Sequence, residues 1–162
     1  IRRAHEILTE AGMQGVYDTG GKPLPEGACP APAIYWGFYH PFDYRGEIFN
    51  HEFAVGAIGC EQASFEAARL WRGDVGKGKG GPWVPGMLKD GVAVAIGPVS
   101  EPYLGAFPET QIFFPRLLSG WCVAQAYWNA IRQRSWRMII IGDPMYRPFP
   151  GGLAADDEPE DD

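Results

Sequence analysis

The stretch RMIIIGDPMYR, residues 137–147, contains the most clearly buried strand that the sequence predicts. Its first half is a short apolar run, the kind that forms a strand buried on both faces of a parallel sheet. The run stops at Gly142-Asp143-Pro144, where Pro fixes φ and the Asp side chain can hydrogen-bond its own turn backbone. The pattern predicts a parallel strand over 138–141 that ends in a rigid turn. Binding and catalytic residues tend to follow the carboxyl ends of such strands, so the residues after this turn are candidates for a site.

Three further apolar runs predict the remaining strands, over 34–39, 53–58 and 92–96. Helices are expected over 1–11, 62–71 and within 110–134, and the glycine-rich segment 73–86 is expected to be a loop. Strands that alternate with helices favour an α/β fold with a mostly parallel sheet covered on both faces. Four strands are few for such a sheet, and a helix precedes the first of them. We therefore expect that the first strands of the fold are missing from this chain, or that a partner completes the sheet.

Length and charge indicate one domain with an acidic tail. The chain has 162 residues, 46% of them apolar, which is enough for one core over residues 1–150. Of its 20 acidic residues, six lie between Asp156 and Asp162, which leaves 14 acidic against 14 basic residues before them. Because the body is electroneutral, we expect no nucleic-acid partner. Residues 151–162 are expected to be a disordered tail, with a docking role as the alternative. No apolar run approaches the length that spans a bilayer.

The cysteine and histidine patterns indicate neither a disulfide framework nor a cofactor. Cys29, Cys60 and Cys122 are an odd number and form no CxxC pair. His40, His51 and Cys60 have acidic neighbours but no tight ligand spacing, so no metal is expected. Residues 73–79, GDVGKGK, match part of a phosphate-binding loop, but the next residue is Gly80 and the segment follows a predicted helix. That mechanism needs Ser or Thr there and a strand before the loop, so we expect a glycine loop and no cofactor.

His40 and Cys60 form the one catalytic hypothesis that the sequence supports. Each follows a predicted strand, so both would project from the same carboxyl edge of a parallel sheet. A thiolate beside an imidazole is a nucleophile for acyl transfer, and a helix that begins after Cys60 would favour the thiolate. Backbone N–H groups near Gly59 and Cys60 would stabilise the oxyanion. The alternative is that Cys60 is a small buried apolar residue and His40 a turn residue.

The order of elements resembles that of the caspase-like (clan CD) cysteine peptidases, in particular their gingipain-like branch. In those proteins one strand ends at the catalytic His and the next at the catalytic Cys, and a last strand ends in Gly-Asp-Pro. The corresponding segments here are 33–40, 53–60 and 138–144. The resemblance implies a caspase-like three-layer sandwich and a secreted, periplasmic or cell-envelope location. Two departures concern catalysis: Pro41 follows His40 where the peptidases have Gly, and the 20-residue step from His40 to Cys60 is short.

The chain is also similar to an uncharacterised bacterial family that ends in Gly-Asp-Pro-Leu, followed by an aromatic residue or Cys and a Pro. The shared motifs are Gly56-Ala57-Ile58 leading into Ser64-Phe65, and Val99-Ser100-Glu101-Pro102. This resemblance implies the fold and no particular activity.

Two functions follow from these patterns: a cysteine peptidase-like hydrolase that uses His40 and Cys60, and a non-catalytic domain that serves as an interaction or structural subunit with protein or peptide partners. Aromatic residues crowd the sequence around His40, which favours the second function because aromatic side chains dominate interface energetics. A pairing of Arg147 with Glu101 across the site edge is also expected. The residues expected along this edge are Gly59, Ser64, Glu101, Asp143, Tyr146 and Arg147.

Overall fold

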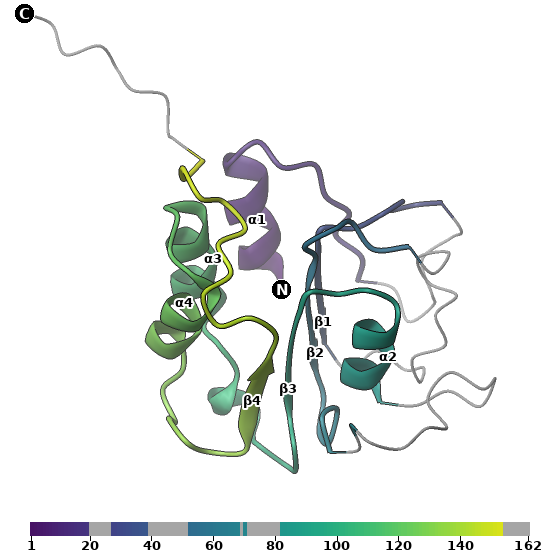
Figure 1. The fold of residues 1–162 in the computed structure, drawn as a ribbon, viewed down its shortest axis with the longest axis vertical. Helices are drawn as coiled ribbons and strands as arrows, with labels where there is room; N and C mark the ends of the chain where they lie inside the picture. The colour runs from purple at the N-terminus through teal and green to yellow at the C-terminus, as the bar shows by residue number, and fades with distance from the viewer. Residues whose placement is uncertain (20–26, 39–51, 69, 71–81, 154–162) are drawn as a thin grey trace, which may run out of the picture.

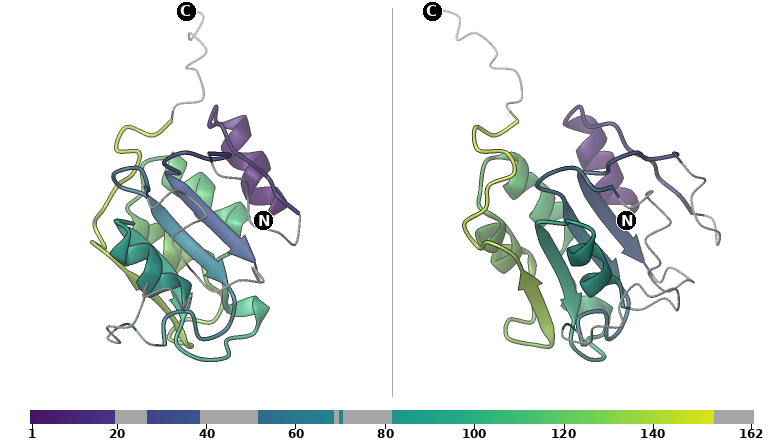
Figure 2. Two further views of the ribbon diagram at one scale, coloured as in Figure 1. Left: turned by 90° about the vertical axis from the view of Figure 1, so that its right-hand side faces the viewer. Right: turned by 45° about the vertical axis from the view of Figure 1, so that its right-hand side comes forward.

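A four-stranded sheet forms the middle layer of the computed structural model, which describes residues 1–19, 27–38, 52–68, 70 and 82–153 (Figure 1). Helices cover both faces of this sheet, so the described part has three layers (Figure 2). The elements are α1 (Arg2–Glu10), β1 (Ile34–Phe38), β2 (Ile58–Gln62), α2 (Trp83–Lys89), β3 (Val94–Pro98), the 3-10 helix η2 (Leu104–Ala106), α3 (Thr110–Leu118), α4 (Val123–Ala130) and β4 (Met138–Ile141).

The strand order is β1-β2-β3-β4. Strands β1, β2 and β3 run parallel, which confirms the α/β class with a mostly parallel sheet. Strand β4 pairs antiparallel with β3, with Ile141 opposite Ala95 and Met138 opposite Pro98. The prediction that 138–141 is a parallel strand was therefore wrong. As a result, the turn at Gly142 lies at the end of the sheet where β1, β2 and β3 begin.

The two faces of the sheet bury different side chains. Alternate residues of the strands, such as Trp36, Cys60 and Ile96, pack against α1, α3 and α4 in the larger core. The other face packs against α2 in a smaller core that includes Ala95, Trp83 and Met87. This alternation follows from the period of two in a strand, which sends successive side chains to opposite faces.

Several element boundaries differ from the prediction. Strand β2 runs through Gln62 and is followed by a bend and turns over 63–68, where a helix was expected. Helix α2 lies in a stretch that was assigned to a loop, and its residues 83–87 are buried. The predicted helical stretch 110–134 is divided into α3 and α4 at Gly120, whose φ is 86°.

The turn after β4 has the chemistry that its sequence predicted. The backbone N–H of Met145 donates to Asp143 Oδ1 at 2.9 Å. Gly142 has φ of 140°, and a Cβ atom there would overlap the carbonyl oxygen of Ala93. Only glycine combines that φ with so close an approach of two backbones.

The body of the domain continues past residue 150, where the sequence predicted that the tail begins. Leu153 N donates to Leu118 O at 2.7 Å. Residues 154–162 of the predicted tail lie outside the described part.

Candidate functional site at the carboxyl edge of the sheet

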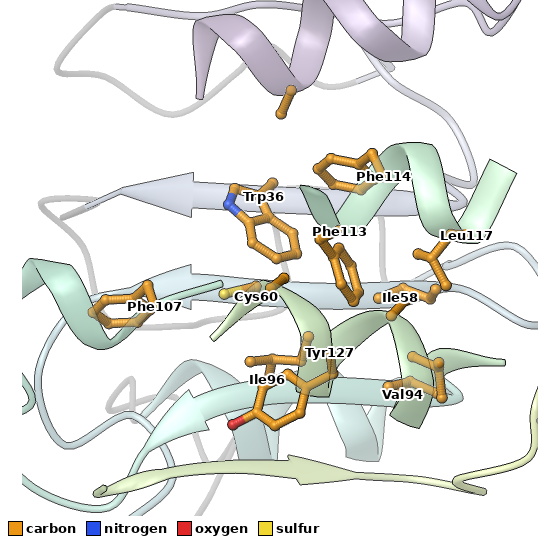
Figure 3. Packing of buried hydrophobic residues seen from close by; sticks show 14 of the residues in the cluster. Trp36, Ile58, Cys60, Val94, Ile96, Phe107, Phe113, Phe114, Leu117 and Tyr127 are labelled. Carbon is orange, nitrogen blue, oxygen red and sulfur yellow. The ribbon is translucent and has the colours of Figure 1, made fainter. Parts of the chain in front are cut away.

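Cys60 lies in the middle of β2 and is fully buried, whereas the sequence predicted it at a strand end. Its side chain enters the larger core beside Trp36 and Phe107 (Figure 3). Burial raises the pKa of the Cys60 thiol well above its usual value, and the nearby carboxylates of Glu61 and Glu66 raise it further. Since β2 continues beyond Cys60, no helix begins there to favour the thiolate. The geometry therefore holds Cys60 as a protonated core thiol.

The other parts of the predicted catalytic site are His40 and the backbone N–H groups of Gly59 and Cys60. His40 lies outside the described residues, so its distance from Cys60 stays a prediction. Gly59 and Cys60 lie in the strand between β1 and β3, where backbone N–H groups serve strand pairing. Gly59 also faces α2, because a Cβ atom there would come within 2.5 Å of Met87 Sδ. These N–H groups therefore take part in the pairing of the sheet, which makes them unsuitable as an oxyanion site.

A buried carboxylate that the sequence reasoning missed lies next to Cys60 on the opposite face of β2. Glu61 is fully buried, and Tyr35 Oη donates to its Oε2 at 2.8 Å. The Tyr35 ring stacks on Trp83 with 4.9 Å between centroids, and Trp83 N donates to Glu66 Oε2 at 2.5 Å. Burial, followed by the charge of Glu61, raises the pKa of Tyr35 well above its usual value. The carboxylates of Glu61 and Glu66 thus anchor α2 to the carboxyl ends of the parallel strands.

The signal for this cluster in the sequence is a glutamate inside an apolar strand together with a glycine on the neighbouring strand. Gly37 is paired with Glu61 in the sheet. A Cβ atom at position 37 would overlap both the Glu61 carboxylate and the Tyr35 hydroxyl. Gly37 therefore provides the space in which this carboxylate is buried.

Large apolar side chains are exposed where β1, β2 and β3 end. We call this set the carboxyl-edge surface and define it by five residues: Phe65, Val99, Tyr103, Leu104 and Trp136. Their exposed fractions range from 38% for Trp136 to 70% for Tyr103. Single exposed apolar residues are ordinary, whereas a large contiguous apolar patch is typical of an interaction site.

Backbone and side-chain hydrogen bonds join the segments of this surface to one another. Phe65 N donates to Ser100 O at 3.4 Å, and Val99 N donates to Arg137 O at 2.8 Å. In the same region, Trp136 Nε1 donates to Pro102 O at 3.3 Å and Arg137 Nη1 to Glu101 O at 3.0 Å. The Arg137 guanidinium also stacks over the Trp136 ring, 4.6 Å from its centroid. Hydrogen bonds thus hold together three chain segments that are distant in sequence at this surface.

Backbone strain concentrates at the same edge. Among the described residues, five non-glycine residues have positive φ, and four of these are Phe65, Tyr103, Ser135 and Arg137. Tyr103 has φ of 61° and ψ of 154°, a region that is essentially restricted to glycine. Bulky residues in such conformations are outliers that cluster at functional sites. The strain therefore lies at two of the five surface residues, Phe65 and Tyr103, and on both sides of a third, Trp136.

The remaining candidate residues are divided between the two ends of the sheet. Ser64 and Glu101 lie at the carboxyl edge, beside Phe65 and Arg137. Asp143, Tyr146 and Arg147 lie at the opposite end, because β4 is antiparallel. There, Tyr146 Oη donates to Gly56 O at 2.9 Å.

The predicted pairing of Arg147 with Glu101 was also wrong. Arg147 Nη1 donates to the carbonyl of Gly120 at 2.6 Å, between α3 and α4. The antiparallel direction of β4 carries Arg147 away from the edge on which Glu101 lies. Arg147 therefore holds the segment after β4 against the helices.

Within the described ranges, no group of three or more His, Cys, Asp and Glu side chains is arranged to hold a metal ion. All three cysteines are free thiols. In the same part of the chain, no helix has the length and apolar character needed to cross a membrane. His51 and the loop 73–79 lie outside the described residues.

Comparison with protein-family models, with curated proteins and with solved structures finds no match for this chain. The function is therefore inferred from the geometry of the chain itself.

Proposed function

We propose that this chain is a non-catalytic, caspase-like α/β domain that binds a protein or peptide partner through the carboxyl-edge surface. The observation that carries this proposal is the display of large apolar side chains on strained backbone at one end of the sheet. Tyr103 and Phe65 hold conformations that cost free energy, and they hold them with their rings in solvent. Folding alone does not account for such an arrangement, whereas burial of aromatic side chains in an interface does.

The state of Cys60 favours this function over a hydrolase. A catalytic cysteine works as a partly exposed thiolate, in surroundings that lower its pKa. Cys60 is fully buried with a raised pKa, and its neighbours Glu61 and Glu66 disfavour the thiolate. A peptidase that used His40 and Cys60 would have to expose this residue from the middle of a central strand. The hydrolase is thus the weaker of the two functional hypotheses.

The caspase-like proposal includes a further strand. We propose that this strand pairs with β1, which is one of the two edge strands of the described sheet. Among the described residues, β1 pairs with β2 alone. Ile58 N donates to Ala33 O at 2.9 Å, so by alternation the backbone groups of Ile34 and Trp36 point away from β2. Strand β1 has the sequence IYWGF, without the charges or prolines that protect edge strands from pairing. A strand from another segment or from a partner would complete the sheet there.

The test compares two matched exposed positions at opposite ends of the sheet. Leu104 and Met145 each have an exposed fraction of 63%, and each would be changed to Asp. The parent and both variants are immobilised after circular dichroism has verified their folding, and the proteins captured from an extract of the source cells are quantified by mass spectrometry. We expect a partner that the parent and Met145→Asp retain and that Leu104→Asp loses. Equal capture by all three proteins would remove the carboxyl-edge surface as the binding site.

A further inference from the structure

Three polar side chains lie in one row inside the larger core. Trp36 is paired with Cys60 across β1 and β2, and Cys60 is paired with Ile96 across β2 and β3. Tyr127 reaches the same core from α4. In Figure 3 the indole nitrogen, the thiol and the phenol oxygen all point toward the carboxyl ends of the strands. The fold thus brings three heteroatoms to the same level of an otherwise apolar core.

Both hydrogen-bonding groups that flank Cys60 lack a partner among the described residues. Trp36 Nε1 and Tyr127 Oη are buried atoms without a hydrogen bond there. The residues themselves are 9% and 5% exposed. A buried donor without an acceptor is strongly unfavourable, and native proteins usually satisfy such groups with ordered water when no protein acceptor is near. The side chains of the other buried residues of this cluster are apolar and carry no oxygen or nitrogen acceptor.

We infer that the row Trp36–Cys60–Tyr127 is an internal binding site for a neutral hydrogen-bond acceptor. The indole N–H can only donate and the phenol O–H can donate or accept, so an acceptor oxygen at this level of the core would satisfy both groups. The occupant is neutral because the walls are apolar and hold no compensating charge. That oxygen belongs to ordered water or to a small neutral molecule that replaces it. This site is separate from the carboxyl-edge surface and does not depend on the proposed interaction function.

Nuclear magnetic resonance and native mass spectrometry test the occupant directly in the purified parent chain. The indole proton of Trp36 is assigned by comparison with a Trp36→Phe variant. A rotating-frame Overhauser cross-peak from this proton to water identifies a hydration site. A missing cross-peak together with an added mass identifies a bound small molecule. The absence of both a cross-peak and an added mass would overturn the inference.

Thermal unfolding of Tyr127→Phe gives an independent test, because the sign of the change is decisive. If an acceptor faces the hydroxyl, its loss should lower the melting temperature by about 2–4 °C. If the hydroxyl is truly alone, its removal relieves an unsatisfied buried group, and the melting temperature should stay equal or rise. Tyr103→Phe is the control, since Tyr103 is 70% exposed and should show no change. An equal or higher melting temperature for Tyr127→Phe would refute the site.

Discussion

Replacing Tyr103 by Gly should stabilise the domain although it removes a large aromatic side chain. Tyr103 has φ of 61° and ψ of 154°, a conformation that glycine adopts freely and that other residues adopt only under strain. Its side chain is largely in solvent, with an exposed fraction of 70%. The substitution therefore relieves strain and gives up little packing.

The magnitude follows from three contributions. Strain at such a residue is of order 1–3 kcal/mol, and the glycine-restricted region lies at about 3 kcal/mol, the upper end of that range. Full burial of a large apolar side chain contributes roughly 1.5–3 kcal/mol, so the smaller buried part of Tyr103 contributes about 0.5–1 kcal/mol. The extra freedom of Gly in the unfolded chain costs about 0.5–1 kcal/mol. The net expectation is a stabilisation of about 1–2 kcal/mol.

Urea denaturation followed by circular dichroism measures this effect, with Tyr103→Ala as the matched variant. Ala loses the same ring and keeps the strain, so it should be destabilised by about 0.5–1 kcal/mol, roughly 2 kcal/mol below Gly. The slopes of the three denaturation curves should agree, which shows that the unfolded states are comparable. If Gly were no more stable than Ala, the strain at Tyr103 would be refuted, and with it a main support for a binding surface.

Two further predictions concern the turn after β4 and the larger core. Gly142→Ala should destabilise the domain by about 3–5 kcal/mol, because strain adds to an overlap with Ala93 O. Gly91→Ala, at φ of 96° with nothing within 4 Å, should lose only about 1 kcal/mol in the same urea assay, and equal losses would contradict the overlap. Burial raises the pKa of Tyr127 from 10.0 to about 12, so the stability from its neutral phenol is fully present below pH 10 and is lost as pH rises through 12. The loss of stability between about pH 9 and pH 12 should be smaller in Tyr127→Phe, and identical pH profiles for the two proteins would refute this.

The apolar runs in the sequence located most of the sheet but not the direction of its last strand. Strands β1, β3 and β4 lie on or within two residues of their predicted positions. The run at 138–141 is apolar at every position, and such a pattern is the same for a parallel and an antiparallel strand. Helix α2 was missed because Pro85 and Gly86 oppose a helix locally. Its burial against the sheet outweighs that preference.

The candidate site could be predicted only in part, for two physical reasons. Gly59 was read as the end of a strand, but its role is to admit Met87 of the packed helix α2. This shifted Cys60 from the middle of β2 to a strand end and suggested a nucleophile. The carboxyl-edge surface depends on positive φ at Phe65 and Tyr103, and bulky residues give no sign of that conformation in a sequence.

Alkylation of the native protein by iodoacetamide, measured separately for each cysteine by peptide mass spectrometry, distinguishes a buried core thiol at Cys60 from an activated nucleophile. Cys29 is partly exposed and serves as the internal control for Cys60, which is fully buried. The parent and His40→Ala are compared as pH rises. We predict that Cys29 is modified while Cys60 stays unmodified in both proteins until urea unfolds them. A Cys60 that reacts well below pH 8 in the parent, and only at higher pH in His40→Ala, would contradict a non-catalytic domain and establish an activated dyad.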